Sequence, residues 1–270
     1  MRIAVPAVGE GGCTSDDDDA IIYYDLGKWT LKRQTVEVAK YRPLRSTDRT
    51  ELFFERPIFD WTGVPAKFFG MIFTRLGAKI PVNTKEFSLV QSANVGEFQI
   101  RYSIYGGRSA ISMFADRLCI EFPVLTPSDY PLAREVLKTV HDGFVSEFPN
   151  CPTTRVERLS SDHIEILPPH TVKAFLAQHR FPRLEEAFKA EAIIEPSIKF
   201  NAKDTTQAWE YAVMAEQSLL HAAALFVMHT LKLLNVSKVP TFEDKVALAM
   251  HVERLTLNAF GLERADAAST

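Results

Sequence analysis

Three short runs of alternating apolar and polar side chains between residues 97 and 124 constrain the fold of this chain most strongly. A period of two is typical of a β-strand with one buried face. Gly106-Gly107 separates the first two runs, and paired glycines suit the positive φ angles of a tight hairpin turn. Pro123 should end the third run, because proline has no N–H for the strand ladder. We therefore predict an antiparallel meander with strands at 97–104, 108–114 and 117–122.

A helix is expected directly after this meander. Ser128 or Asp129 can cap its first turn, and Pro131 suits the opening turn of a helix. Apolar residues then recur at helical spacing as far as Phe148. Since a three-stranded meander with one apolar face needs a cover, this helix is its nearest candidate.

The remaining segments indicate further strands and helices. Strands are predicted within 20–41, at 85–91, in 153–167 and at 196–200. Helices are predicted at 64–77, 170–179, 184–192, 205–234 and 242–260. Residues 42–60 are interpreted as a long connection, because Pro57 and Asp60 favour a loop.

These elements predict the α+β class. We expect a mainly antiparallel sheet with a central meander, helices packed mostly on one face, and two C-terminal helices. A sheet that wraps a long helix would enclose an apolar cavity, as in helix-grip folds, although such an architectural analogy carries no functional weight.

The chain is expected to form one structured unit behind an acidic arm. Residues 1–19 are predicted to be flexible, because their glycines and the run Asp16–Asp19 offer nothing to a core. Residues 20–262 should then form a single α+β domain. A loose repetition of strands followed by a helix leaves open two intimately packed subunits, 20–125 and 126–262.

Composition favours a soluble protein and gives no electrostatic argument for a polyanionic partner. The net charge is −3, and 46% of the residues are hydrophobic. We therefore expect neither nucleic-acid nor membrane binding. The apolar stretch Leu219–Leu234 is shorter than the roughly 20 residues of a membrane span, and a cytoplasmic location is expected.

Known catalytic and cofactor motifs are absent from the sequence. It contains no GxGxxG or GxxxxGK[ST] phosphate loop, no HExxH and no GxSxG. The three cysteines are widely spaced and include no CxxC pair, so neither a zinc site nor a disulfide framework is indicated. We expect no cofactor and no metal.

Histidines and carboxylates supply weak candidates for catalysis. His163 and Glu165 share one face of the 153–167 strand. His221 and His251 lie on the two predicted C-terminal helices and could approach each other, with Glu253 nearby, if those helices pack antiparallel. Ordinary hydrogen-bonded or solvated histidines are the simpler interpretation, because no spacing matches a helical metal pair.

Arginines on predicted strands supply weak candidates for ligand binding. Arg101, Arg117 and Arg155 could form an anion-binding floor if they shared one face of the sheet. The neighbouring carboxylates Glu121 and Glu157 are equally well placed for cross-strand ion pairs, which is the simpler alternative.

Two functional classes remain open. The first is a non-catalytic module that binds a protein partner or a small ligand. The second is an enzyme, a hydrolase or a metal-dependent one, with dispersed His, Glu and Asp residues. The predicted 205–234 helix is apolar on several sides, so it is also a candidate homodimer surface.

Overall fold

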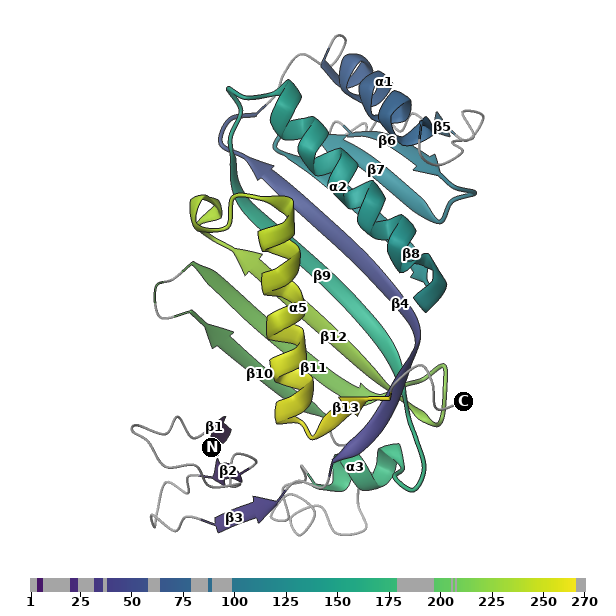
Figure 1. The fold of residues 1–270 in the computed structure, drawn as a ribbon, viewed down its shortest axis with the longest axis vertical. Helices are drawn as coiled ribbons and strands as arrows, with labels where there is room; N and C mark the ends of the chain where they lie inside the picture. The colour runs from purple at the N-terminus through teal and green to yellow at the C-terminus, as the bar shows by residue number, and fades with distance from the viewer. Residues whose placement is uncertain are drawn as a thin grey trace, which may run out of the picture.

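The computed structural model describes residues 4–6, 20–23, 32–35, 38–57, 64–78, 87–88, 99–178, 197–204, 206 and 208–265. A large, mainly antiparallel sheet of ten strands dominates this part of the chain (Figure 1). Its order is β10-β11-β12-β9-β4-β8-β7-β6-β5, and β13 pairs in parallel with β4. The predicted α+β class is therefore confirmed.

The strands of the main sheet are β4 (Ala39–Phe54), β5 (Phe87–Ser88), β6 (Gln99–Ile104), β7 (Ser109–Phe114), β8 (Arg117–Leu125), β9 (Thr153–Ile166), β10 (Ile198–Lys203), β11 (Trp209–Gln217), β12 (Ala224–Leu233) and β13 (Leu262–Arg264). The α-helices are α1 (Val64–Gly77), α2 (Tyr130–Glu147), α3 (Val172–Gln178) and α5 (Phe242–Ala259). A separate small sheet contains β1 (Ala4–Pro6), β2 (Ala20–Tyr23) and β3 (Lys32–Thr35).

Several predictions for the N-terminal and central segments lie outside the described residues. Of the predicted arm, only β1 is described, and it pairs with β2. The predicted helix at 184–192 lies entirely outside the described residues. Of the predicted strand at 85–91, only β5 is described.

The predicted meander is confirmed as β6, β7 and β8. These strands pair antiparallel in sequence order, and the last pair before the first turn is Ile104–Ser109. The turn is longer than predicted, and positive φ angles occur at Tyr105 as well as at Gly106 and Gly107. Strand β8 continues to Leu125, so the predicted end at Pro123 is wrong. Proline is tolerated there because only some positions near a strand end need an N–H.

Strand β4 is the largest element that the sequence analysis missed. Residues 42–60 were expected to be a connection, yet Ala39–Phe54 form a central strand paired with both β8 and β9. The alternation is hidden because β4 contains irregularities in register and because Ser46, Asp48 and Thr50 are polar although they face inward. Tertiary placement therefore overrides the local pattern.

The predicted helix at 205–234 is also wrong. This segment forms the antiparallel hairpin of β11 and β12, joined by a turn at residues 218–223. Apolar side chains on both faces of these strands, including Met214, Phe226 and Met228, conceal the period of two. Of the two C-terminal helices that were expected, the structure has α5, and the segment proposed as a homodimer helix forms strands instead.

Helix α5 forms for the reasons that its sequence indicates. The backbone N–H of Asp244 donates to Oγ1 of Thr241 over 3.1 Å, and the Asp244 carboxylate accepts from the Thr241 backbone. This reciprocal pattern is a capping box, which satisfies N–H groups that the first helical turn leaves unpaired. The helix therefore begins at the predicted position.

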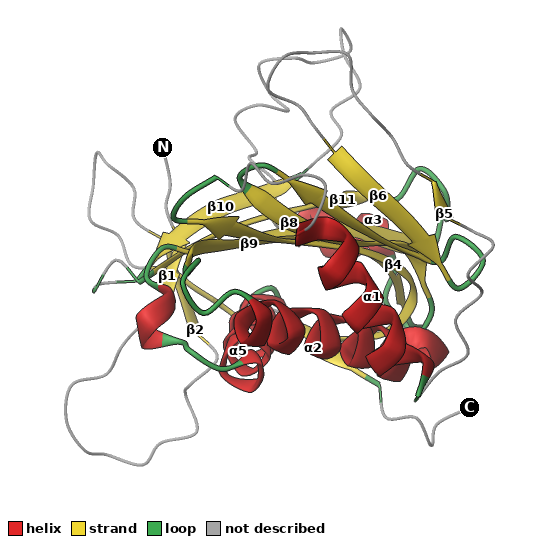
Figure 2. Cartoon of the chain, turned by 90° about the horizontal axis from the view of Figure 1, so that it is seen from above, coloured by secondary structure: helices red, strands yellow, loops and turns green. Residues whose placement is uncertain are grey.

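Helices α1, α2 and α5 lie on the same face of the sheet (Figure 2). Phe144 of α2 stacks on Phe54 of β4, with ring centroids 4.7 Å apart. Phe68 of α1 meets the edge of Phe144 at 6.0 Å. These contacts join α1, α2 and the sheet in one aromatic core, and large buried rings are a major source of packing energy.

The order of elements is repeated along the chain. Strand β4 is followed by α1, the meander β6-β7-β8 and helix α2, and strand β9 is followed by α3, the meander β10-β11-β12 and helix α5. Strands β4 and β9 are neighbours at the centre of the sheet, and each meander extends outward from one of them. This arrangement places α2 and α5 together over the central strands, as Figure 1 shows.

Candidate functional site

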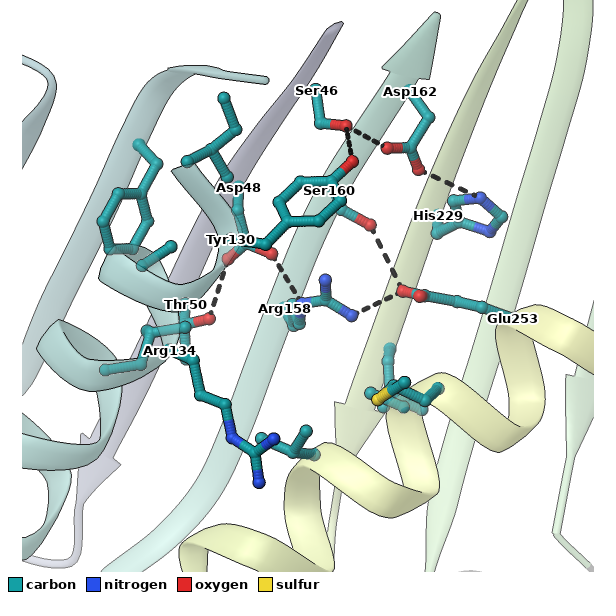
Figure 3. Close-up of a pocket in the computed structure, with 18 of the residues that line it drawn as sticks. Ser46, Asp48, Thr50, Tyr130, Arg134, Arg158, Ser160, Asp162, His229 and Glu253 are labelled. Carbon is teal, nitrogen blue, oxygen red and sulfur yellow. Dashed lines mark hydrogen bonds and ion pairs between the residues drawn. The ribbon is translucent and has the colours of Figure 1, made fainter. Parts of the chain in front are cut away.

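A cavity of about 610 Å³ lies between the central strands and helices α2 and α5. Its walls are largely apolar, and polar side chains gather on one part of the sheet (Figure 3). The apolar lining includes Leu52, Ile120, Phe122, Leu137, Val156, Ile164, Val227, Leu231, Leu233, Val246, Ala249 and Leu257. This combination of size and lining is typical of sites for small molecules.

The pairing of β4 with β9 assembles the polar floor of the cavity. Three inward positions of β4 stand opposite three inward positions of β9, and all of these residues line the cavity. The opposed pairs are Ser46–Asp162, Asp48–Ser160 and Thr50–Arg158. Side chains directly opposite each other on an antiparallel pair are close enough to interact. Six polar residues from two distant segments therefore share one small area.

Arg158 is held between two carboxylates on this floor. Its Nε donates to Oδ2 of Asp48 over 2.7 Å, and its Nη1 donates to Oε1 of Glu253 from α5 over 2.5 Å. Burial opposes the positive charge, but the two carboxylates outweigh burial and raise the pKa of Arg158 above its ordinary value. The arginine is therefore permanently charged and fixes α5 to the sheet.

Asp162 is the most perturbed acid of the floor. Oγ of Ser46 donates to Asp162 over 2.5 Å, and the hydroxyl of Tyr130 lies 3.0 Å from the same Ser46 oxygen. Burial raises the pKa of Asp162 to about 6, with the charges of Glu253 and Asp48 adding to this effect. Asp162 can therefore exchange a proton near neutral pH, unlike an ordinary aspartate.

His229 of β12 faces Asp162 without reaching hydrogen-bond distance. Its Nε2 lies 3.6 Å from Oδ2 of Asp162, and its Nδ1 lies 2.5 Å from the hydroxyl of Tyr211. Burial lowers the pKa of His229, so the ring is neutral at pH 7. The side of the ring that faces the cavity is thus left without a close partner in the described structure.

Asp162 should make stability depend on pH in an unusual direction. Because its folded pKa of about 6 exceeds the usual 3.8, the folded state keeps a proton that the unfolded state loses between these values. The free energy of unfolding should therefore fall as pH rises from about 4 to 6, by at most about 3 kcal/mol. Urea unfolding of the wild type and Asp162→Asn across this range checks the effect. A difference between the two proteins that does not change with pH would contradict it.

Of the carboxylate and histidine candidates from the sequence, the structure places Glu253 in the cavity. His163 and Glu165 share one face of β9 as expected, but residues of the other parity line the cavity. Nδ1 of His163 is 2.9 Å from Oγ of Ser218, and Glu165 pairs with Arg42. His163 and Glu165 therefore lie on the face of β9 that points away from the cavity.

The other two histidine candidates lie apart from each other and from the cavity. His221 is exposed in the β11–β12 turn, with its ring 5.8 Å from that of His163. His251 is exposed on α5 and does not line the cavity. Their expected approach depended on a helix at 205–234, which the structure replaces with strands.

The three arginine candidates also lie outside the cavity lining. Arg101 pairs with Glu121, Arg117 contacts Glu51 at 3.2 Å, and Arg155 contacts Glu157 at 3.0 Å. The guanidinium groups of Arg117 and Arg155 also stack on Phe114 and Phe53 at 4.0 Å. Glu121 and Glu157 belong to the ion-pair alternative, whereas Glu51 was not expected as a partner, and Arg155 and Glu157 lie on the same strand.

The arrangement does not resemble a nucleophilic or metal site. In a serine hydrolase the histidine contacts the serine, whereas here Asp162 contacts Ser46 and faces His229. Among the described residues, no group of three or more His, Cys, Asp or Glu side chains could hold a metal ion. What the cavity offers is an apolar volume with hydrogen-bonding and charged groups at one place.

Comparisons with other proteins add no functional information. No protein-family model, curated protein or solved structure matches this chain.

No helix within the described ranges is long and apolar enough to cross a membrane.

Proposed function

We propose that this protein binds a small, largely apolar ligand in the cavity between the sheet and helices α2 and α5. The carrying observation is a volume of about 610 Å³ with mostly apolar walls and one polar cluster. Apolar walls supply affinity, because they remove apolar ligand surface from water. The cluster around Arg158 and Asp162 supplies orientation, because its buried groups gain from a partner of matching chemistry.

A fluorescent apolar probe tests this proposal. N-phenyl-1-naphthylamine is neutral at pH 7 and becomes brighter in apolar surroundings, so it should bind with one saturable site per chain. Val246→Trp places an indole in the cavity wall and should weaken binding at least about tenfold, because the lost volume excludes the probe.

A matched control separates a blocked cavity from a damaged helix. Ala247→Trp introduces the same side chain one residue away, at an exposed position of α5 that does not line the cavity. This variant should bind the probe like the wild type. Equal binding by all three proteins would contradict the proposed site.

An enzyme remains the second candidate, and one observation favours it. The pKa of Asp162, about 6, suits a general base or acid near neutral pH, and this residue faces the cavity. If the protein is an enzyme, a bound ligand should be chemically converted, and Asp162→Asn should abolish conversion while the ligand still binds. Recovery of the ligand unchanged after prolonged incubation would favour the binding function.

A further inference from the structure

The polar floor carries more negative than positive charge. Asp48, Asp162 and Glu253 face the single guanidinium of Arg158, and neutral His229 adds no charge. Figure 3 shows these side chains converging from β4, β9, β12 and α5. Uncompensated charge in a poorly solvated site is costly, so a cation bound there would be stabilised.

Several polar atoms of the floor have no close partner in the described structure. The hydrogen bonds of Asp162 and Glu253 use Oδ1 and Oε1, which leaves Oδ2 and Oε2 available. His229 is only 3% exposed, yet its Nε2 is 3.6 Å from Asp162 Oδ2, beyond hydrogen-bond distance. Nδ1 of His229 is already hydrogen-bonded to Tyr211, so Nε2 is the ring atom that a ligand group in the cavity could still contact.

Among the described residues, the other cations that line the cavity form no ion pair with Asp48, Asp162 or Glu253. Nζ of Lys245 donates to the carbonyl of Pro240 over 2.7 Å, at the start of its own helix. Arg264 is exposed at the end of β13. Arg134 is exposed on α2, and Figure 3 shows its guanidinium apart from Asp162 and Glu253.

We propose that the cavity takes an amphipathic cation, an ammonium or guanidinium group held by Asp162 and Glu253 and joined to an apolar body. This inference rests on the proposed function and specifies its ligand class. The charged group would lie on the floor, where N–H donors meet the free carboxylate oxygens, and the apolar part would lie along α5. A carboxylate ligand is disfavoured there, because it would face three carboxylates.

Three probes with the same alkyl chain test the charge preference at pH 7.5. Octylamine is a cation, octan-1-ol is neutral and octanoate is an anion, so they differ mainly in the head group. Displacement of N-phenyl-1-naphthylamine and direct calorimetry both give their dissociation constants. Octylamine should bind at least about tenfold more tightly than octan-1-ol, and octanoate should bind most weakly.

Asp162→Asn and Glu253→Gln identify the groups that hold the cation. In each variant the ratio of the octan-1-ol and octylamine dissociation constants should fall toward one, and circular dichroism should confirm the fold. Wild-type protein provides a second readout without substitution. Octylamine should bind more weakly as pH falls through about 6, where Asp162 takes a proton, whereas octan-1-ol should not follow this change.

The outcomes separate this inference from the proposed function. If octan-1-ol binds as tightly as octylamine, or octanoate binds best, the cation preference is wrong while the cavity remains a ligand site. An octylamine preference that survives both substitutions places the ammonium group elsewhere and also overturns the inference. If none of the four probes binds, both proposals fail.

Discussion

Arg158→Met should lower the free energy of unfolding by about 3–5 kcal/mol at pH 7, as measured by urea unfolding. The substitution removes the one positive charge between Asp48 and Glu253, which lie on opposite sides of the guanidinium. Asp48 is 7% exposed, so its carboxylate is largely removed from bulk solvent. Two carboxylates left together in a poorly solvated site repel each other and lose their hydrogen bonds.

Two further proteins make this prediction specific. The triple variant Asp48→Asn, Arg158→Met, Glu253→Gln should regain most of the lost stability, because neither position 48 nor position 253 then carries an unpaired charge. Arg134→Met removes an exposed arginine that also lines the cavity and should change stability by less than about 0.5 kcal/mol. If Arg158→Met and Arg134→Met have similar effects, the ion triad does not hold α5 to the sheet.

Phe144→Ala should cost about 3–5 kcal/mol of stability, because it leaves a cavity in the aromatic core under α2. Phe144 is 1% exposed and contacts Phe54 at 4.7 Å and Phe148 at 5.0 Å between ring centroids. Neighbouring rings cannot fill the space without losing their own packing. Thermal and urea unfolding should both show the loss.

Val145→Ala is the matched control for this core prediction. Val145 is the next residue of α2 and is 53% exposed, so its side chain contributes little to the core. Its replacement should change stability by less than about 0.5 kcal/mol. Similar losses for Val145→Ala and Phe144→Ala would mean that α2 is not packed on the sheet through Phe144.

Local patterns identify the elements whose two faces differ clearly. The meander β6-β7-β8 alternates and has glycines at its turn, α2 and α5 have helical spacing, and α5 also has a capping box. These elements need few contacts with distant segments to define their type. The sequence is therefore sufficient for them and for the α+β class.

Patterns fail where both faces of a strand have the same character. Strand β12 carries apolar residues on both faces, so it was interpreted as helix, and its hairpin with β11 was missed. In β4 the inward residues Ser46 and Asp48 are polar, and the strand was interpreted as a connection. Polar residues facing inward make sense only once a cavity and its partners are known.

The candidate site was predictable only in part. The sequence indicates Glu253 as a candidate, but it does not indicate that Asp48, Arg158, Asp162 and His229 form a group. In β9 polar residues occur on both faces, so nothing in the sequence marks Arg158 and Asp162 as inward-facing. Their partners on β4 lie 110 and 116 residues earlier, and only the strand pairing brings them together.

Photolabelling with a small apolar diazirine tests the central claim, ligand binding in the cavity, most directly. After irradiation with 3-trifluoromethyl-3-phenyldiazirine, peptide mass spectrometry locates the labelled residues. We predict labels at cavity-lining positions such as Val246, Ala249 and Leu231, and loss of these labels when excess N-phenyl-1-naphthylamine is present. Labels confined to exposed apolar residues such as Leu219 and Leu220, with none in the cavity, would contradict the account.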